Sequence, residues 1–238
     1  FCTATCPTYQ LLGDELDGPR GRIYLIKQVL EGVEPTIKTQ QHLDRCLTCR
    51  SCESTCPSGV QYGRLVDIGR EIVEHKVGRS TGETIKRTVL RKGFLSKKSF
   101  GAALAVGRAM RPFLPSSLAA KVPPRREPGA WPTAKQKRTV LLMNNCVQDA
   151  LAPSIDASAA RVLAVAGITL QPVAAGGCCG ALPLHLNAHE DTVTRVRANI
   201  DAWWPLVEAG AEAIVGTASG CAGMLKDYGH FMQHDAAY

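Results

Sequence analysis

One run of cysteines limits what this chain can fold into more than any other feature. It reads Cys46-x2-Cys49-x2-Cys52-x3-Cys56, with Pro57 directly after it. Three thiolates spaced three residues apart can reach three irons of a cubane, so the run predicts a [4Fe–4S] cluster. Zinc is the alternative reading, although zinc sites usually use two separated cysteine pairs. Haem attachment is excluded because no histidine follows either Cys-x-x-Cys.

The first residues repeat the end of this run as Cys2-x3-Cys6-Pro7. In two-cluster ferredoxins, the fourth cysteine of each run binds the cluster of the other run. We therefore expect Cys46, Cys49, Cys52 and Cys6 to hold one complete cluster. Cys2 and Cys56 would hold a second cluster with two residues that this chain lacks. The alternative is that Cys2 and Cys6 are incidental thiols.

A second cysteine set comprises Cys146, Cys178, Cys179 and Cys221, each at the end of an expected strand. The carboxyl ends of parallel strands border one crevice, so we expect these four side chains to converge. Gly176, Gly177 and Gly180 would let the backbone turn around the adjacent pair. Buried structural cysteines are the alternative, because free cysteine is a common core residue.

Composition divides the chain into three regions, and the fold class expected from them is α+β overall. Residues 1–80 predict a helical ferredoxin-type domain, with apolar stripes Ile23/Ile26/Leu30 and Leu65/Ile68/Ile72 on two helices. Residues 81–137 predict a basic helical segment followed by a Pro-rich linker. Residues 138–238 alternate strand and helix, which predicts an α/β domain with a small parallel sheet. In this last region we expect Ser154 or Asp156 to cap a helix, and Pro205 to kink or divide another.

The net charge of +7 is concentrated in one segment of the chain. Residues 86–138 contain 14 Lys and Arg and one acid, giving +13, so the remainder sums to −6. Apolar residues alternate with the cations, which is typical of a peripheral contact with an anionic membrane surface. A solvated surface or a dock for an acidic subunit explains the charge equally well. Nucleic-acid binding is disfavoured because aromatics are few and no binding motif accompanies them. No apolar stretch approaches the roughly 20 residues of a membrane-spanning helix.

Other residues add no catalytic chemistry. The sequence has no GxGxxG after a strand, no P-loop and no acid–base constellation near the cysteines. We expect His185, His189 and His230 to be surface or packing residues rather than ligands, and Trp203 and Trp204 to serve packing. A chain with iron–sulfur ligands and no organic-cofactor site is expected to conduct electrons.

Several segments resemble one family, the iron–sulfur subunits of glycolate oxidase (glycolate dehydrogenase). They are residues 13–32, GDELDGPRGRIYLIKQVLEG; residues 42–70, beginning HLDRCLTCRSC; residues 176–187, GGCCGALPLHLN; and residues 217–230, TASGCAGMLKDYGH. The resemblance implies two N-terminal [4Fe–4S] clusters followed by cysteine-rich CCG domains of the heterodisulfide-reductase type. Only one CCG domain is present, so we expect the chain to be a fragment cut at both ends.

The resemblance also implies a function. The chain would pass electrons from flavin subunits, which oxidise glycolate to glyoxylate, towards a quinone or respiratory acceptor. It would have no substrate-oxidising site itself, and would be cytoplasmic, peripheral on the inner face of the membrane. A lactate- or glycerol-3-phosphate-oxidising complex, or a thiol/disulfide redox protein, are the alternatives. One departure concerns Ala218, where the full CCG motif has a cysteine. The four remaining cysteines leave open a conventional cluster, another metal or a redox-active thiol site.

Overall fold

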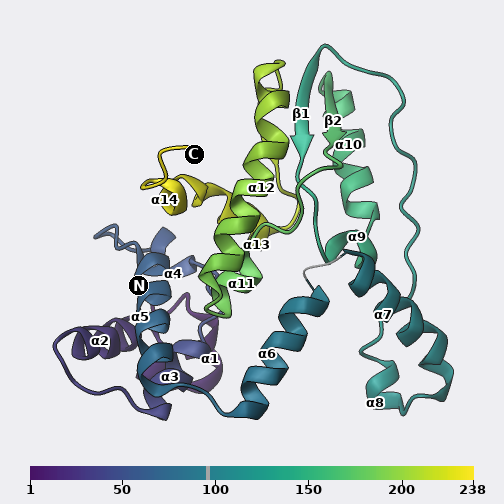
Figure 1. The fold of residues 1–238 in the computed structure, drawn as a ribbon. Helices are drawn as coiled ribbons and strands as arrows, with labels where there is room; N and C mark the ends of the chain where they lie inside the picture. The colour runs from purple at the N-terminus through teal and green to yellow at the C-terminus, as the bar shows by residue number, and fades with distance from the viewer. Residues whose placement is uncertain (95–96) are drawn as a thin grey trace. The chain divides into compact units, whose positions relative to one another are not determined.

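The computed structural model describes residues 1–94 and 97–238, which divide into two compact units at Ile85/Lys86. The composition-based boundary at residue 80 lies close to this division, which falls inside a helix. Each unit has its own hydrophobic core. Figure 1 labels the helices and strands of both units.

The first unit is helical. Its elements are α1 (Pro7–Leu12), the 3-10 helix η1 (Glu15–Asp17), α2 (Pro19–Leu30), α3 (Ile37–Asp44), α4 (Ser51–Ser54), α5 (Tyr62–Val77) and the start of α6 (Thr81–Phe94). Helices α2, α3 and α5 pack against one another. Their core comprises Ile26, Val29, Leu43, Cys52, Tyr62, Val66 and Val73.

The two predicted helices are present, and their expected apolar stripes are right in part: Ile26 lies in the core and Ile23 and Ile72 pack against it, whereas Leu30 and Ile68 are exposed. In α5 the buried face carries Val66, Gly69 and Val73, whereas Ile68 is 49% exposed. Gly69 explains the shift, since a Cβ there would lie 2.5 Å from Cγ1 of Ile26. The helices therefore meet across a glycine, which a hydrophobicity pattern does not recognise. In α2 the polar side chain of Arg22 likewise takes an inward position, while Leu30 is exposed.

The second unit begins with basic helices and ends with the sheet. Its elements are the end of α6, then α7 (Lys97–Met110), η2 (Arg111–Phe113), α8 (Ser116–Ala119), β1 (Arg138–Leu142), α9 (Gln148–Leu151), α10 (Ser154–Val165), β2 (Ile168–Pro172), α11 (Ala181–His185), α12 (His189–Glu208), β3 (Ile214–Val215), α13 (Ser219–Lys226) and α14 (Tyr228–Met232). The Pro-rich stretch 121–137 contains no helix or strand, as predicted.

Three parallel strands form the sheet in the order β2-β1-β3, which confirms the predicted fold class. Alternate residues of β1 face opposite sides. Val140 and Leu142 pack with Ala160 of α10, while Leu141 contributes to a core with Val196 and Trp203 of α12. The sheet therefore lies between α10 and α12 (Figure 1).

Two expectations about helix ends differ from the structure. Neither Ser154 nor Asp156 caps α10: the N-cap is Pro153, without a side-chain hydrogen bond. Asp156 is instead buried, where it accepts a hydrogen bond from Thr217 at 2.5 Å. Pro205 does not divide α12, which runs through it to Glu208. Among the described residues, no helix is both long and apolar enough to cross a membrane.

Candidate iron–sulfur and cysteine-rich sites

The loop that carries the first cysteine run is shaped by local backbone turns and one buried arginine. Thr48 and Arg50 adopt left-handed φ values of 53° and 58°, which fold the chain back between the cysteines. Arg70 of α5 donates to the carbonyls of Leu43 at 2.9 Å and Cys46 at 2.6 Å. It thereby fixes the end of α3 and the start of the loop with charge-assisted hydrogen bonds.

Four cysteines from two distant segments line one cavity. Cys6 lies at the start of α1, Cys46 and Cys49 lie in the loop, and Cys52 lies in α4; the same cavity is also lined by Arg22 and Tyr62. We call it the four-cysteine cavity. It contains the grouping that the repeated Cys-x3-Cys-Pro predicted, although the binding of a cluster there stays a prediction.

Hydrogen-bond donors face the sulfurs of this cavity. The amide of Thr48 donates to Sγ of Cys46 at 3.4 Å, and the Tyr62 hydroxyl donates to the same sulfur at 3.5 Å. Burial acts to raise the pKa of Cys6, but hydrogen bonds from the Thr8 hydroxyl and nearby amides, together with Arg22, bring its pKa below the usual value. Burial raises the pKa of Cys52 to about 12, with Cys46 adding to the effect. Donors and a nearby cation are what an anionic cluster requires from its protein.

A buried ion-pair network supplies that cation. Arg22 is 1% exposed and donates to the Thr8 hydroxyl at 3.1 Å and to Asp17 at 3.4 Å. Asp17 also accepts from Arg45 at 2.8 Å and lies 3.1 Å from Nδ1 of His42. The oxygens of Asp17 are thus engaged by cations, which argues against a metal ion between Asp17, its neighbour Asp14 and His42, although their ligand atoms lie within 4.8 Å of one another.

Cys2 and Cys56 lie outside the lining of the four-cysteine cavity. Amides of Val60, Ser58 and Gly59 face the Cys56 sulfur, and these backbone hydrogen bonds lower its pKa. The hydroxyls of Thr5 and Thr55 lie 3.3 Å apart, which brings the segment of Cys2 beside that of Cys56. The two segments could therefore contribute to one further site.

The cysteine sulfurs of the described residues do not form the compact group that surrounds a single zinc ion. Four sulfurs around zinc lie about 3.8 Å apart, given Zn–S bonds of about 2.3 Å and tetrahedral angles. Within residues 1–94 and 97–238, no three cysteine sulfurs lie within 4.8 Å of one another. A cubane spreads its four thiolates over four irons and needs no such close approach. The four thiols, the hydrogen-bond donors and the buried cation thus supply the chemistry that a [4Fe–4S] cluster requires.

The second cysteine set converges at the carboxyl ends of the strands, as predicted from the strand order. Cys146 follows β1, Cys178 and Cys179 follow β2, and Cys221 lies in the first turn of α13 after β3. Their thiols interact pairwise, Cys146 with Cys178, Cys178 with Cys179, and Cys179 with Cys221. Hydrogen bonds from Cys146 and Cys179 lower the pKa of Cys178, while those interactions raise the pKa of the two partners.

Buried polar side chains hold the loop that carries the adjacent pair. Asn199 accepts from the amide of Gly177 at 2.7 Å and donates to the Cys178 carbonyl at 3.1 Å. Gly176 has φ +83°, and a Cβ there would lie 2.7 Å from Oδ1 of Asn199. A side chain at position 176 would therefore displace the amide that orients the loop.

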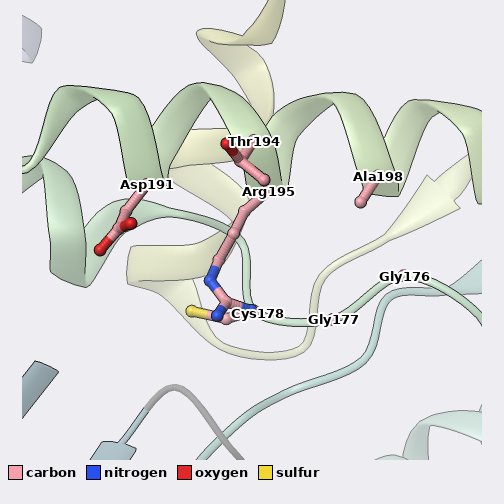
Figure 2. Close-up of a pocket in the computed structure, with 7 residues that line it drawn as sticks. All are labelled: Gly176, Gly177, Cys178, Asp191, Thr194, Arg195 and Ala198. Atoms are coloured by element: carbon pink, nitrogen blue, oxygen red, sulfur yellow. The ribbon is translucent and has the colours of Figure 1, made fainter. Parts of the chain in front are cut away.

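A cavity opens beside Cys178, with Gly176, Gly177 and residues of α12 around it (Figure 2). The guanidinium of Arg195 lies next to the Cys178 sulfur in this view, and its charge adds to the lowering of that pKa. The second set therefore has one cation at its accessible side. Of the four thiols, it is Cys178 that lines this cavity.

The other residues singled out from the sequence take lesser positions. His185 ends α11, His189 begins α12 and His230 lies in α14; within the described ranges none joins two cysteines in a compact three-ligand group. Trp203 is buried and stacks on Tyr228 with ring centroids 5.9 Å apart, whereas Trp204 is 58% exposed. Ala218, the N-cap of α13, offers no ligand in place of the missing cysteine.

Sequence reasoning missed the polar residues that support both sites: Arg22, Tyr62, Arg70, Asn199 and Tyr228. Each is nearly fully buried. The sequence offered one signal for these residues: a polar or aromatic residue spaced by one helical turn from an apolar core residue, as Arg22 is from Ile26. Such a position is identified only when the true buried face is known.

Family models match both parts of the chain. Residues 1–61 match a 4Fe-4S dicluster domain, and residues 140–226 match a cysteine-rich domain (CCG). The dicluster match supports iron–sulfur clusters in the first unit. No solved structure is significantly similar to this chain.

Curated relatives extend the similarity to the full chain. The glycolate oxidase iron-sulfur subunit of Escherichia coli is 57% identical over the whole chain, and the probable glycolate oxidase iron-sulfur subunit of Bacillus subtilis is 29% identical over 99% of it. The chain spans 59% of the length of each. The lactate utilization protein A of an Exiguobacterium species is 29% identical over 42% of this chain and 39% of its own length. The chain thus matches a 4Fe-4S dicluster domain over residues 1–61 and a cysteine-rich CCG domain over residues 140–226, and over its full length it is similar to iron-sulfur subunits of glycolate oxidase.

Proposed function

We propose that this chain is the electron-transfer part of a glycolate-oxidising complex. The observation that carries the proposal is the four-cysteine cavity, where Cys6, Cys46, Cys49 and Cys52 surround one space beside the buried Arg22. A cluster there supplies one-electron chemistry, and the residues of this chain bind it, exclude water and donate hydrogen bonds to its sulfurs. The names of two relatives support glycolate as the substrate of the complex.

The ligand sets follow from the two segments. Cys6, Cys46, Cys49 and Cys52 would bind one [4Fe–4S] cluster, and Cys2 and Cys56 would bind a second with two ligands from outside this chain. The amides that face Cys56 support its role as a thiolate ligand. The four cysteines of the second set would form a further redox centre, holding an iron–sulfur cluster, another metal or a thiol pair.

Variants of the full-length protein can assign these ligands by their grouping. In protein purified without oxygen, Cys6→Ser and Cys46→Ser should remove the same cluster and leave the same residual electron paramagnetic resonance spectrum. Cys2→Ser and Cys56→Ser should both remove the second cluster and leave the spectrum of the cluster bound by Cys6, Cys46, Cys49 and Cys52. If the purified protein contained zinc in place of iron and sulfide, the electron-transfer role would be refuted. If Cys6→Ser and Cys56→Ser left the same residual spectrum, only the ligand assignment would be refuted.

Flavin-containing dehydrogenase subunits are the proposed electron donors, and a quinone or membrane acceptor is the proposed recipient. The complex assembled with its flavin subunits should show cluster reduction on adding glycolate. Lactate and glycerol 3-phosphate serve as the rival substrates. If Cys178→Ser and Cys179→Ser variants kept full electron transfer, the second set would lie off the main route, as a separate thiol/disulfide function requires.

We further propose a cytoplasmic location with peripheral contact at the inner face of the membrane, through residues 86–138. Val106, Met110 and Phe113 follow at helical spacing and are exposed, Phe113 by 79%, with the exposed cations Arg111 and Lys121 nearby. Apolar side chains among cations suit an anionic lipid surface. Nucleic acid is not a proposed partner.

Vesicle flotation tests this contact. The protein should float with vesicles containing phosphatidylglycerol and stay behind with phosphatidylcholine alone. High salt and Phe113→Ser should weaken flotation, whereas Trp204→Ser, an exposed aromatic elsewhere in the same unit, should not. Absence of flotation from the iron-loaded protein would favour a docking surface for an acidic subunit.

A further inference from the structure

We infer that Tyr62, supported by the buried Arg22, raises the reduction potential of the cluster in the four-cysteine cavity and so makes it a better electron acceptor. The inference rests on the proposed function, because it requires a cluster in that cavity. It concerns residues that are not ligands and that no similarity assigns.

Tyr62 is placed to act on one sulfur. It is the first residue of α5 and is 4% exposed, with its ring packed in the core of the first unit. Its hydroxyl donates to Sγ of Cys46 at 3.5 Å, and its side chain lines the cavity. Because the ring is fixed by packing, the hydroxyl needs no reorganisation when the charge on the sulfur changes.

Arg22 is a buried cation close to both Tyr62 and Thr8. The guanidinium donates to the Thr8 hydroxyl at 3.1 and 3.2 Å, and that hydroxyl lies 3.2 Å from Sγ of Cys6. Arg22 also lines the cavity directly. Its partner Asp17 is shared with Arg45, so the ion-pair group of these three residues has a net positive charge.

The direction of the effect follows from the charge change. Reduction transfers one electron, supplied by the reduced flavin of the partner subunit, and changes no covalent bond of the cluster. The added negative charge is shared with the thiolate sulfurs, so a hydrogen-bond donor and a nearby cation stabilise the reduced form more than the oxidised form. In a water-poor cavity this difference is larger than at the surface.

A matched pair of tyrosine variants tests the inference in the full-length, cluster-loaded protein. Tyr62→Phe removes only the donor, and Tyr24→Phe makes the same change at an exposed tyrosine of α2. Redox titration followed by electron paramagnetic resonance should show the reduction equilibrium constant of this cluster falling about three- to tenfold for Tyr62→Phe, where tenfold equals about 59 mV. Tyr24→Phe should match the wild type.

Arg22→Gln and Arg20→Gln form a second pair, since Arg20 is an exposed arginine of the same helix. Only Arg22→Gln should lower the potential, by at least as much as Tyr62→Phe. Intact clusters with unchanged potentials in both Tyr62→Phe and Arg22→Gln would overturn the inference and leave the proposed function standing. Zinc without iron in the wild type would overturn both. Should Tyr62→Phe fail to hold its cluster, the arginine pair decides alone, and an unchanged potential in Arg22→Gln would then reject the inference.

Discussion

The side chains of Asn199 and Tyr228 form a buried pair, in which the Asn199 amide donates to the phenolic oxygen at 2.8 Å. Tyr228 in turn donates to the Cys179 carbonyl at 2.9 Å, while Asn199 contacts Gly177 and the Cys178 carbonyl. Helix α12 therefore holds the backbone at Gly177 and Cys178, and α14 holds the backbone at Cys179.

Asn199→Ala should destabilise the second unit by about 2–3 kcal/mol, because the Gly177 amide and the Cys178 carbonyl both lose the side chain that they bond, and Tyr228 loses one of its two hydrogen bonds. Urea unfolding measures the loss. Asn144→Ala is the matched control, since its amide makes a single solvent-exposed bond to the Ala175 carbonyl, and its cost should stay below about 1 kcal/mol. Equal losses in the two variants would contradict the role given to Asn199.

Gly69→Ala should destabilise the first unit by about 1–3 kcal/mol, because the new methyl group overlaps Ile26 at the crossing of α2 and α5. Thermal unfolding monitored by circular dichroism measures the change, and the cost of Gly69→Ala should be smaller in an Ile26→Ala background, which lacks the Cγ1 and Cδ1 atoms that the new methyl group would meet. Gly82→Ala, in α6 with open space around its Cβ position, should stabilise by up to about 1 kcal/mol. A tolerated Gly69→Ala would show that the two helices can separate at little cost.

Asp17 should make the stability of the first unit depend on pH. Burial acts to raise the pKa of this carboxyl, but hydrogen bonds from His42 and Arg45 outweigh it and hold the pKa below its usual value. The unfolded value is about 3.9, so ionised Asp17 stabilises the fold above that pH, and the stabilisation is lost as pH falls through the lower folded value.

Asp17→Asn should therefore cost about 3–5 kcal/mol at pH 7, since it leaves Arg22 buried without its counter-ion. The difference from the wild type should shrink as the medium is taken below about pH 4. Urea unfolding at pH 7, 4 and 3, with bound iron assayed at each pH, measures this. Asp235→Asn, at the surface pair with Arg197, should change stability little at any of these values. A constant difference across the range would rule out the assigned linkage.

Removing iron should loosen the first unit selectively. Without a cluster, the cavity keeps Cys6 and Cys52 buried beside Arg22 with no centre to bind them, so binding contributes directly to folding. Hydrogen exchange should show faster exchange in residues 42–63 after oxidation and chelation, and little change in α10 of the second unit. Uniform exchange before and after treatment would mean that the loop is held by the protein alone.

The sequence predicted the positions of the cysteines better than it predicted the residues that surround them. Strand order alone placed Cys146, Cys178 and Cys221 at one edge, because parallel strands end together. The helical stripes identified Ile26 as a core residue but missed Arg22 and Gly69, which also face inward, since one is polar and the other has no side chain. Asn199 could not be identified either, because a buried polar residue does not contribute to the hydrophobic periodicity of its helix.

The order β2-β1-β3 also affects how this site could vary among relatives. The helices between the strands return on the sheet's two faces, so residues can be added to α10 or α12 without moving the strand ends. The intervals of 32 residues from Cys146 to Cys178 and 42 from Cys179 to Cys221 are therefore free to change in length. A pattern search with fixed gaps would miss homologous sites, whereas one anchored on an apolar strand followed by cysteine would find them.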